Sequence, residues 1–469
     1  MTALATSRAS LLNAPFRLGL LACAWALLAA GPGLGQNWPS FRGPGASGVT
    51  EGPELPRDWD LATGRNLRWK LPIPGLGHSS PVVWQDKVFL TTAVSSATEL
   101  EFLHGLSGDM RPAKDLSSQS WHLLCIDKKS GQLLWDRTLR EGVPHEPRHP
   151  KNSFATPTVA TDGKVVIAYL GSEGLYAFDL EGKPLWQKDL GVQRAGFAKN
   201  PEFQWGVGSS PILYRDRVVL QCDGNDQSYL AAFDAQDGHP VWRTERGEQP
   251  SWSTPTVVAG PDFDQLVTVA PGSVRGYRAA TGEELWRLRW DMLIVESTPV
   301  TASGLVYVSS GKGSRHPILA VKPTARGDIT LPEGQTQSDA VAWSTQKGGP
   351  ITTSVLVYGE YLYAMEDQGF LRCFRAKTGE LLYEQRIPKD FLSSPVASGG
   401  KVYLAADDGE VLVIQAGPSY ELLATNQLPE AIVATPAISD GLLLVRTVAG
   451  LYAFGNTPPP PAPATAASA

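Results

Sequence analysis

The stretch "RNLRWKLPIPGLGHSSP" (Arg65–Pro81) decides the fold of this chain. Its first half has the form of the last strand of a repeat, with Trp69 in an apolar segment. Its second half, Ser79-Ser80-Pro81, has the form of the start of the next repeat. The strands that should precede Trp69 are missing on the N-terminal side, and their position decides the architecture.

Five segments share one pattern, in which an apolar strand, a short turn and a strand with a conspicuous aromatic residue follow one another. They are "LLCIDKKSGQLLWDRTL" (123–139), "LYAFDLEGKPLWQKDL" (175–190), "LAAFDAQDGHPVWRTE" (230–245), "VRGYRAATGEELWRLR" (274–289) and "LRCFRAKTGELLYEQR" (371–386), with weaker copies at 318–346 and 411–427. Repeats of about 40–45 residues with four strands each are typical of propeller blades.

Each repeat opens with a Ser or Thr step, in seven cases followed by proline. The openers are Ser80-Pro81, Thr156-Pro157, Ser210-Pro211, Thr254-Pro255, Thr298-Pro299, Thr353-Ser354-Val355, Ser394-Pro395 and Thr435-Pro436. Proline cannot donate a ladder hydrogen bond, so it suits the first residue of a strand. The wider spacings predict blades with inserted loops.

The eighth opener explains the missing strands. It leads into "TPAISDGLLLVRTVAGLYAFG" (435–455), which supplies three strands and stops, while "NLRWKL" (66–71) supplies a fourth. Closure of this kind removes the exposed edges of an open array. The sequence therefore predicts an all-β fold, an eight-bladed β-propeller over residues 60–456, in which an N-terminal strand completes the C-terminal blade.

Two columns of residues recur in the repeats. The aromatic column contains Trp69, Trp135, Trp186, Trp242, Trp286, Trp343 and Tyr383, with Leu423 as an apolar substitute. The small-residue column contains Cys125, Ala177, Ala232, Gly276, Ala320, Cys373, Val413 and Ala453. We expect the large side chain of a neighbouring blade to cover each small residue and to lock the blades together, at roughly 2–3 kcal/mol for each buried Trp.

The repeat also carries a family resemblance. The pattern "AFD-x-x-TG-x-x-LW", as at Ala177–Asp179 and Thr281–Trp286, resembles the pyrroloquinoline-quinone (PQQ) repeat, and "NWPSFRGPGASGV" (37–49) resembles the lead-in of secreted PQQ-binding-like propellers of bacteria. The resemblance implies the quinoprotein-like fold. That fold serves the quinoprotein alcohol dehydrogenases, which are enzymes, and the propeller lipoprotein of the outer-membrane β-barrel assembly machinery, which is a scaffold.

For the enzymes, the resemblance implies a site with several required groups. It consists of a vicinal disulfide over the quinone, a Trp beneath it, and Ca²⁺ held by Glu, Asn and Asp, with a further Asp as base. This sequence has no Cys-Cys pair; Cys125, Cys222 and Cys373 stand alone. We therefore expect no PQQ, no calcium, no other metal and no catalytic residues. The "DGNDQ" segment (223–227) and the loop with His145 and His149 are interpreted as a polar turn and a solvated connection.

The two ends of the chain lie outside the repeats and differ from them in composition. Residues 1–35 have a charged start, a short apolar run and small residues, as a secretory signal does, and Leu21 makes Cys23 a poor lipid-attachment site. Residues 36–59 form a lead-in, and residues 457–469 a Pro/Ala tail that we expect to be disordered. We predict an exported protein, periplasmic or extracellular, without a transmembrane segment.

The net charge and the loop lengths limit the classes of partner that this chain can bind. The net charge of −6 supplies no basic footprint for nucleic acid. Long loops are predicted on one face of the ring, at 91–120, 141–154, 191–208, 247–252, 291–296 and 310–317, and long loops often carry binding. The candidate residues on this face are Asn152, Arg194, Lys199, Phe203, Trp205, Trp252, Glu296, Lys312 and Arg315.

We therefore expect a monomeric, non-catalytic module that binds a protein, a peptide or a small ligand. A quinoprotein-like oxidoreductase with an altered site is the alternative, and a scaffold of outer-membrane protein assembly is a further one.

Overall fold

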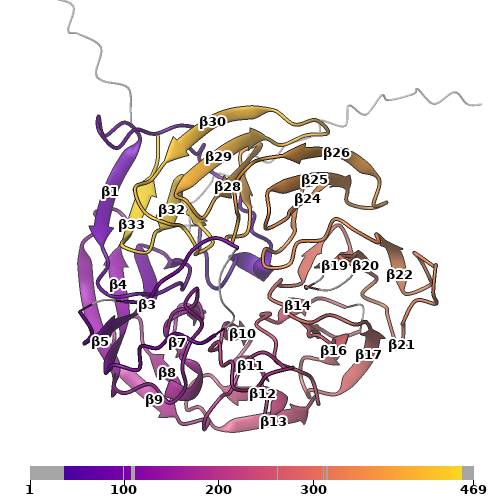
Figure 1. The fold of residues 1–469 in the computed structure, drawn as a ribbon, viewed down its shortest axis with the longest axis horizontal. Helices are drawn as coiled ribbons and strands as arrows, with labels where there is room; N and C mark the ends of the chain where they lie inside the picture. The colour runs from indigo at the N-terminus through magenta and orange to yellow at the C-terminus, as the bar shows by residue number, and fades with distance from the viewer. Residues whose placement is uncertain are drawn as a thin grey trace, which may run out of the picture. The chain divides into compact units, whose positions relative to one another are not determined.

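The computed structural model describes residues 36–98, 100–106, 111–260, 262–309, 311–312 and 315–456. The expected signal segment with Cys23 and the expected disordered tail both lie outside the described residues. The strands of the described residues form eight sheets, arranged as blades around a central axis (Figure 1). The eight-bladed all-β propeller is confirmed.

The first four blades follow one another along the chain. Blade 1 contains β2 (Val82–Trp84), β3 (Lys87–Ser95), β4 (Gln119–Asp127) and β5 (Leu133–Gly142). Blade 2 contains β6 (Ala160–Thr161), β7 (Val166–Tyr169), β8 (Leu175–Phe178) and β9 (Pro184–Lys188). Blade 3 contains β10 (Ile212–Tyr214), β11 (Arg217–Asp223), β12 (Ser228–Asp234) and β13 (Pro240–Glu245). Blade 4 contains β14 (Thr256–Val258), β15 (Gln265–Val269), β16 (Ser273–Arg278) and β17 (Glu284–Arg289), with the short β21 (Gly327–Asp328) added in parallel.

The remaining blades complete the ring. Blade 5 contains β18 (Val300–Ala302), β19 (Leu305–Ser309), β20 (Ile318–Val321) and β22 (Val341–Ser344). Blade 6 contains β23 (Leu356–Tyr358), β24 (Tyr361–Met365), β25 (Phe370–Arg375) and β26 (Leu381–Arg386). Blade 7 contains β27 (Val396–Ser398), β28 (Lys401–Ala405), β29 (Glu410–Gln415) and β30 (Leu422–Gln427). Blade 8 contains β31 (Ala437–Ser439), β32 (Leu442–Arg446), β33 (Gly450–Phe454) and β1 (Leu67–Pro72).

The pairing of β1 closes the ring. β1 runs antiparallel to β33, with Trp69 opposite Ala453 and Pro72 opposite Gly450. The strands missing before Trp69 are therefore those at the C-terminal end of the chain, as the sequence predicts.

The inner strands differ from the outer ones because of how blades stack. All four residues of β8 are buried, since neighbouring blades cover both faces of the sheet. In β9, the outermost strand of the same blade, exposed and half-buried residues alternate. The core thus lies between adjacent blades rather than at one centre.

The aromatic column reaches across the gaps between blades. The Trp186 ring of blade 2 lies against Gly238 in the last turn of blade 3, where a Cβ would come within 2.7 Å of the ring. The indole N–H of Trp186 donates to the Ala235 carbonyl of the same turn at 3.0 Å. Trp69, Trp135 and Trp343 contact Gly131, Gly182 and Gly379 of the next blade in the same way, each with an indole hydrogen bond.

This geometry corrects one sequence expectation. The small residues are not covered by a neighbouring blade's Trp; they pair across strands with the Trp of their own blade, as Ala177 does with Trp186. The Trp ring instead covers a glycine of the following blade, which has positive φ and no side chain to obstruct it.

Four blades depart from the pattern. In blade 3, Trp242 lies against Gly282, but its buried indole N–H has no hydrogen-bond partner among the described residues, and in blade 6 Tyr383 takes the place of the Trp. In blade 4 the indole N–H of Trp286 donates to Gln265 of its own blade. In blade 7 the residue opposite Val413 is Ala424 and not Leu423, because the turn between β29 and β30 is one residue longer than the turn between β25 and β26. Trp59 of the lead-in enters between blades 7 and 8, where its ring stacks on Phe454 at 4.2 Å and its backbone N–H donates to Asn426.

The lead-in crosses the face of the ring that bears the tight turns. Trp38 bridges Val83 of blade 1, and the short helix η1 (Pro44–Ala46) lies at the centre of the ring (Figure 1). Arg42 is fully buried there and donates to the carbonyls of Val355 and Pro395, from blades 6 and 7. A second short helix, η2 (Gly171–Glu173), connects β7 and β8.

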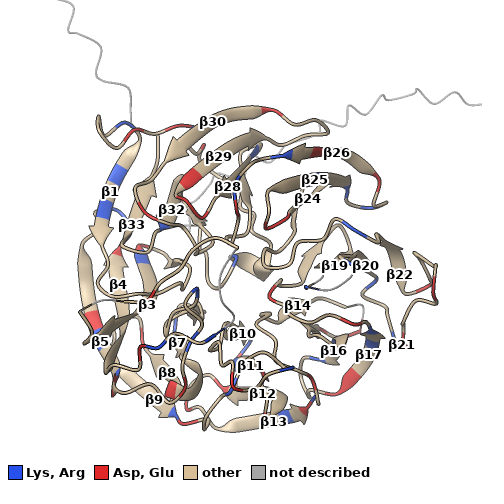
Figure 2. Cartoon of the chain, viewed as in Figure 1, with Lys and Arg blue, Asp and Glu red and all other residues tan. Residues whose placement is uncertain are grey.

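Charges of both signs are mixed around the ring. Figure 2 shows Lys and Arg close to Asp and Glu in most blades, without a sector of one sign in this view. Among the described residues, no helix has the length and apolar character needed to cross a membrane.

Candidate functional site

A central cavity of about 490 Å³ lies at the axis of the ring. Its wall is formed by the predicted loop-rich face, since Leu106, Lys151, Trp205, Trp252, Glu296 and Lys312 all line it and come from six different loops. Phe41 of the lead-in also lines the cavity, next to Arg42. The lead-in therefore closes the axis at the opposite end.

The blade openers form a ring of hydroxyl groups in the cavity. We call this set the hydroxyl crown; it contains Thr158, Ser210, Thr254, Ser354, Ser394 and Thr435. Each crown hydroxyl accepts the backbone N–H of the preceding blade's opener at 2.8–3.1 Å, as Thr158 does from Ser80 and Thr435 does from Ser394. No crown hydroxyl donates to another described residue, so each O–H proton is available to a ligand or to water.

The crown corrects the predicted opener of blade 2. The hydrogen bonds and the distance to the first strand place Thr158 in the column, two residues after the Thr156-Pro157 step. Blade 2 thus begins without proline, as blade 6 does. Repetition of the Thr-Pro dipeptide was a misleading signal at this one position.

Two further links complete the circle where the crown is interrupted. Between blades 4 and 5, the Ser253 hydroxyl donates to the Ser297 carbonyl at 2.8 Å. At the seam between blades 8 and 1, Arg446 donates to the carbonyl and hydroxyl of Ser79 at 2.7 and 2.6 Å. Burial lowers the pKa of Arg446 to about 9.

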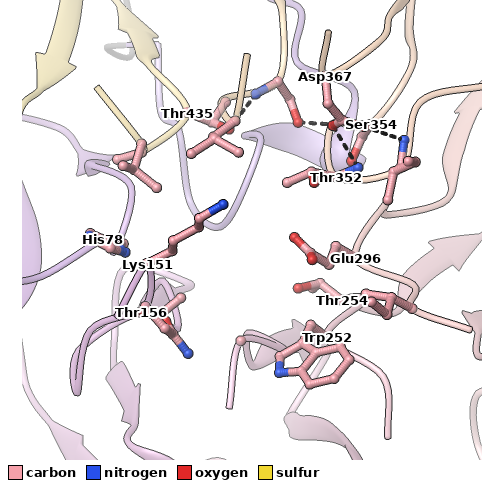
Figure 3. Close-up of a pocket in the computed structure, with 18 of the residues that line it drawn as sticks. His78, Lys151, Thr156, Trp252, Thr254, Glu296, Thr352, Ser354, Asp367 and Thr435 are labelled. Atoms are coloured by element: carbon pink, nitrogen blue, oxygen red, sulfur yellow. Dashed lines mark hydrogen bonds between the residues drawn. The ribbon is translucent and has the colours of Figure 1, made fainter. Parts of the chain in front are cut away.

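Charged side chains face one another across the cavity without pairing. Lys151 extends its ammonium group into the cavity, and Glu296 faces it from blade 5's side (Figure 3). Within the described residues, the Lys151 ammonium has no hydrogen-bond partner and no carboxylate within 4 Å. Asp367 is 4% exposed and accepts the backbone N–H groups of Ile351 and Thr352 at 3.0 and 2.9 Å.

Burial and nearby charges shift the pKa values of these groups. Burial, followed by the Asp367 carboxylate, raises the pKa of Glu296 to about 7, and Lys151 opposes the shift. Burial also raises the pKa of Asp367. Burial lowers the pKa of Lys151, against the attraction of Glu296, Asp390 and Asp407. The cavity thus holds charges that its own residues do not fully compensate.

An aromatic wall lies beside these charges. The rings of Trp205 and Trp252 are 5.5 Å apart, and Phe197 stacks on Trp205 at 5.5 Å. The indole N–H of Trp252 donates to Gly206 at 2.7 Å, and its backbone N–H donates to Val295 at 2.9 Å. Trp252 therefore ties the loop of blade 3 to the one that carries Glu296.

The insertion of blade 1 reaches the cavity from its mouth. Phe102 packs edge-on against His78, which is buried and lines the cavity. Burial, followed by repulsion from Arg446, lowers the pKa of His78 to about 3, so its ring is neutral. His104 lies 3.6 Å from the carboxylate of Asp407, on the far side of the ring.

The predicted site residues divide into two groups. Asn152, Trp205, Trp252, Glu296 and Lys312 line the cavity, whereas Arg194, Lys199, Phe203 and Arg315 do not. Arg194 lies against Glu146, and Lys199 and Arg315 are exposed on the loops. Asn152 is used internally, because its amide donates to Trp205 and Val207 and accepts from Ser153 and Thr156.

Sequence reasoning missed Lys151, His78, Asp367 and the crown. Lys151 stands in a loop that the sequence singled out, but nothing in one sequence separates it from its exposed neighbours. The openers were recognised as strand starts, and their periodicity around an axis could have indicated a ring of hydroxyl groups.

The two other polar segments serve the fold. Asp223 is buried and pairs with Arg246 at 2.8 Å, while His145 bonds Glu173 and the His149 ring packs on Trp205. Among the described residues, one group of potential metal ligands is close enough to hold an ion, and it is the turn residues Asp234, Asp237 and His239, away from the cavity.

The cavity does not fit the quinone site that the resemblance implies. Trp252, Glu296 and Asp367 are of the right residue types, but Cys125, Cys222 and Cys373 are free, buried and in three different blades. The one amide of the lining that corresponds to a calcium ligand, Asn152, has its oxygen occupied by Ser153 and Thr156. We derive no quinone chemistry for this chain.

Comparison with known proteins places the chain in a family. The family model described as "Outer membrane protein assembly factor BamB" matches residues 119–338 and 333–417. The BamB protein of Yersinia pestis is 20% identical over 329 residues, which cover 69% of this chain and 78% of that protein. The BamB protein of Moranella endobia is 25% identical over 280 residues, which cover 59% and 68%.

Solved structures share the fold at low identity. BamB from Moraxella catarrhalis superposes with a TM-score of 0.53 at 14% identity, covering 78% of this chain and 98% of that one. The quinohemoprotein alcohol dehydrogenase of Comamonas testosteroni superposes with a TM-score of 0.61 at 13% identity, covering 91% and 82%. With the repeat, the eight closed blades and the family match together, this chain belongs to the BamB-like family of PQQ-repeat β-propellers.

Proposed function

We propose that this protein is a non-catalytic binding module of the cell envelope that works through its loop-rich face and the central cavity in that face. The observation that carries the proposal is the cavity itself, which has six loops at its mouth and the lead-in at its base. Pockets of this kind, mostly apolar with a few convergent polar groups, are where proteins bind small ligands. The misfit with the quinone site supports a binding role over a redox role.

A crosslinking experiment tests the use of this face. A photoreactive amino acid is placed at Lys199 or Arg315, both exposed on the loops, and at Lys183, in a tight turn on the opposite face. After irradiation in cells, we expect crosslinked species from the two loop positions and none from Lys183. Equal labelling of both faces, or none at the loops, would exclude the proposal.

A cofactor experiment tests the absence of redox activity. Purified protein is incubated with PQQ and calcium and assayed for dye reduction with primary alcohols. We expect no dye reduction above the level of free PQQ. Alcohol-dependent reduction at one quinone per chain would favour the oxidoreductase alternative instead.

Assembly of outer-membrane proteins is the second candidate function. It is supported by the family match and by relatives named as outer membrane protein assembly factors. It predicts that the protein co-purifies with an outer-membrane barrel insertase, and that Lys199 and Arg315 crosslink to it. Recovery of the protein free of that insertase under mild solubilisation would count against this candidate.

A further inference from the structure

We propose that the central cavity binds a small zwitterionic molecule, an amino acid or a short peptide, with its carboxylate on the Lys151 side and its ammonium group on the Glu296 side. The inference rests on the binding role proposed above and names the chemistry of the ligand.

The first argument is the separation of opposite charges. Lys151 projects into the cavity from the loop of blade 2, and Glu296 faces it from the loop before blade 5 (Figure 3). Lys151 has no carboxylate within 4 Å among the described residues, although opposite charges in a shared cavity attract strongly at low dielectric. A ligand that lies between the two groups would pair with both.

The second argument is the cost of leaving these charges as they are. A charge taken out of water is stabilised only when it is paired and hydrogen-bonded. Glu296 faces Asp367, a like charge, and among the described residues neither carboxylate forms an ion pair. A ligand ammonium group on this side would compensate both carboxylates. A ligand carboxylate on the other side would compensate Lys151 and Lys312, an exposed residue of the cavity lining.

Ions of a single charge fit less well. An anion near Lys151 would also face the carboxylates of Glu296, Asp390 and Asp407, which act on Lys151 itself. A cation near Glu296 would face Lys151 in the same cavity. A molecule with opposite charges at its two ends is attracted by Lys151 on one side and by Glu296 on the other. A neutral polyol has no such attraction to either group.

The hydroxyl crown supplies the remaining recognition. Its O–H groups have their acceptor side occupied by backbone N–H groups, so towards the cavity they serve as donors. Donors around an axis suit carboxylate and peptide carbonyl oxygens. Trp252 offers an apolar surface for a side chain, and a cavity of about 490 Å³ is in the range for small organic ligands.

Matched ligands test the charge assignment. The full chain is titrated calorimetrically with alanine, dialanine and trialanine, and with the best binder after N-acetylation or C-terminal amidation. Glucose serves as the neutral comparison. We expect one free form to bind, and each blocked form to bind roughly ten- to a hundredfold more weakly, as for loss of a hydrogen bond between charged groups.

Matched variants assign each end of the ligand to its side chain. Lys151→Met should weaken the free form and remove the penalty of amidation, while it keeps the penalty of acetylation. Glu296→Gln should do the reverse. Lys164→Met, an exposed lysine of a tight turn, is the control and should bind as the unmodified protein does. Thermal unfolding checks that all three variants are folded.

Several results would overturn the inference. It would be wrong if the blocked forms bound as well as the free ones. It would also be wrong if glucose bound and the peptides did not, or if no member of the panel bound. These results would leave the crosslinking test of the loop-rich face intact. If the ligand titration and the crosslinking test both failed, the binding role itself would be excluded.

Discussion

At the scale of single residues, Glu296 makes the most specific prediction. Burial and Asp367 raise its pKa from 4.5 to about 7, so the folded protein holds a proton that the unfolded chain releases in this interval. Stability is therefore highest at the low end of the interval and falls as the pH rises through it. We expect a loss of about 2–3 kcal/mol between roughly pH 5 and pH 8, measured by urea unfolding.

Glu296→Gln should remove much of this pH dependence. The amide has no proton to release, so the variant should match the parent near pH 5 and exceed it near pH 8. Asp367, whose pKa is also raised, should leave a smaller slope of the same sign. A variant whose unfolding depends on pH as the parent's does would show that Glu296 is not the group responsible.

Such residues differ in how far they can be predicted from the sequence alone. Glu296 and Trp252 could be named because they stand in long loops of one face, and loop position follows from the repeat. Lys151 and Asp367 could not, because whether a loop side chain turns inward depends on contacts from other blades. Arg42, buried and without a carboxylate partner among the residues that the structure describes, is equally hard to recognise, since nothing local distinguishes it from a surface arginine.

At the scale of elements, the contact between Trp and the next turn should stabilise each pair of blades. Trp186→Ala should cost about 2–3 kcal/mol, because it removes the contact of a half-buried ring with Gly238 and the hydrogen bond to Ala235. Trp186→Phe should cost less, since the ring surface is kept and one hydrogen bond is lost. Leu185→Ala, at the exposed neighbouring position, should change stability by less than about 0.5 kcal/mol in the same assay.

Trp59 makes a parallel prediction for an element outside the repeats. Blade 7 has Ala424 where the other blades have Trp or, in blade 6, Tyr383, and Trp59 stacks on Phe454 at the interface of blades 7 and 8. Trp59→Ala should therefore destabilise the protein at least as much as Trp186→Ala, by several kcal/mol. A loss below about 1 kcal/mol would mean that the lead-in is dispensable at this interface.

Local pattern identifies elements well when each repeat carries its own signal. The turns and outer strands followed from Gly and Trp spacing, because these residues have a steric role in every blade. The shifted opener of blade 2 and the aligned residue of blade 7 did not follow, since a displaced proline or one extra turn residue changes the spacing without changing the structural position. Trp59 was missed for a related reason: it replaces a blade residue from a distant part of the chain.

At the scale of the whole molecule, the ring depends on β1. Removal of residues 36–74 should leave the edge of β33 unpaired and the axis open, and exposed edges promote association. We expect light scattering after gel filtration to show oligomers or aggregates for this truncation. As a control, a chain without residues 457–469 should elute as the full chain does. If the chain without residues 36–74 were monomeric and unfolded cooperatively, the prediction would be contradicted.

The fold at this scale was readable from the sequence because the chain itself showed an incomplete first repeat and an incomplete last one. The base of the cavity was not, since the lead-in has no repeat to align with. Its role emerges from contacts such as those of Arg42 with the start of blades 6 and 7.

The pairing of β1 with β33 has a consequence for the order in which the molecule is made. A ribosome finishes β1 among the first strands, yet its partner is the last strand of the chain. Until synthesis ends, β1 has no partner strand, although Trp69 can already contact blade 1, and native contacts between such remote segments form slowly. Until translation ends, an unpaired apolar strand must therefore be kept from associating with other chains. Premature release of the chain or a stalled ribosome leaves this strand unpaired, which carries a higher risk of misassociation than in a protein whose neighbouring strands are also neighbours in sequence.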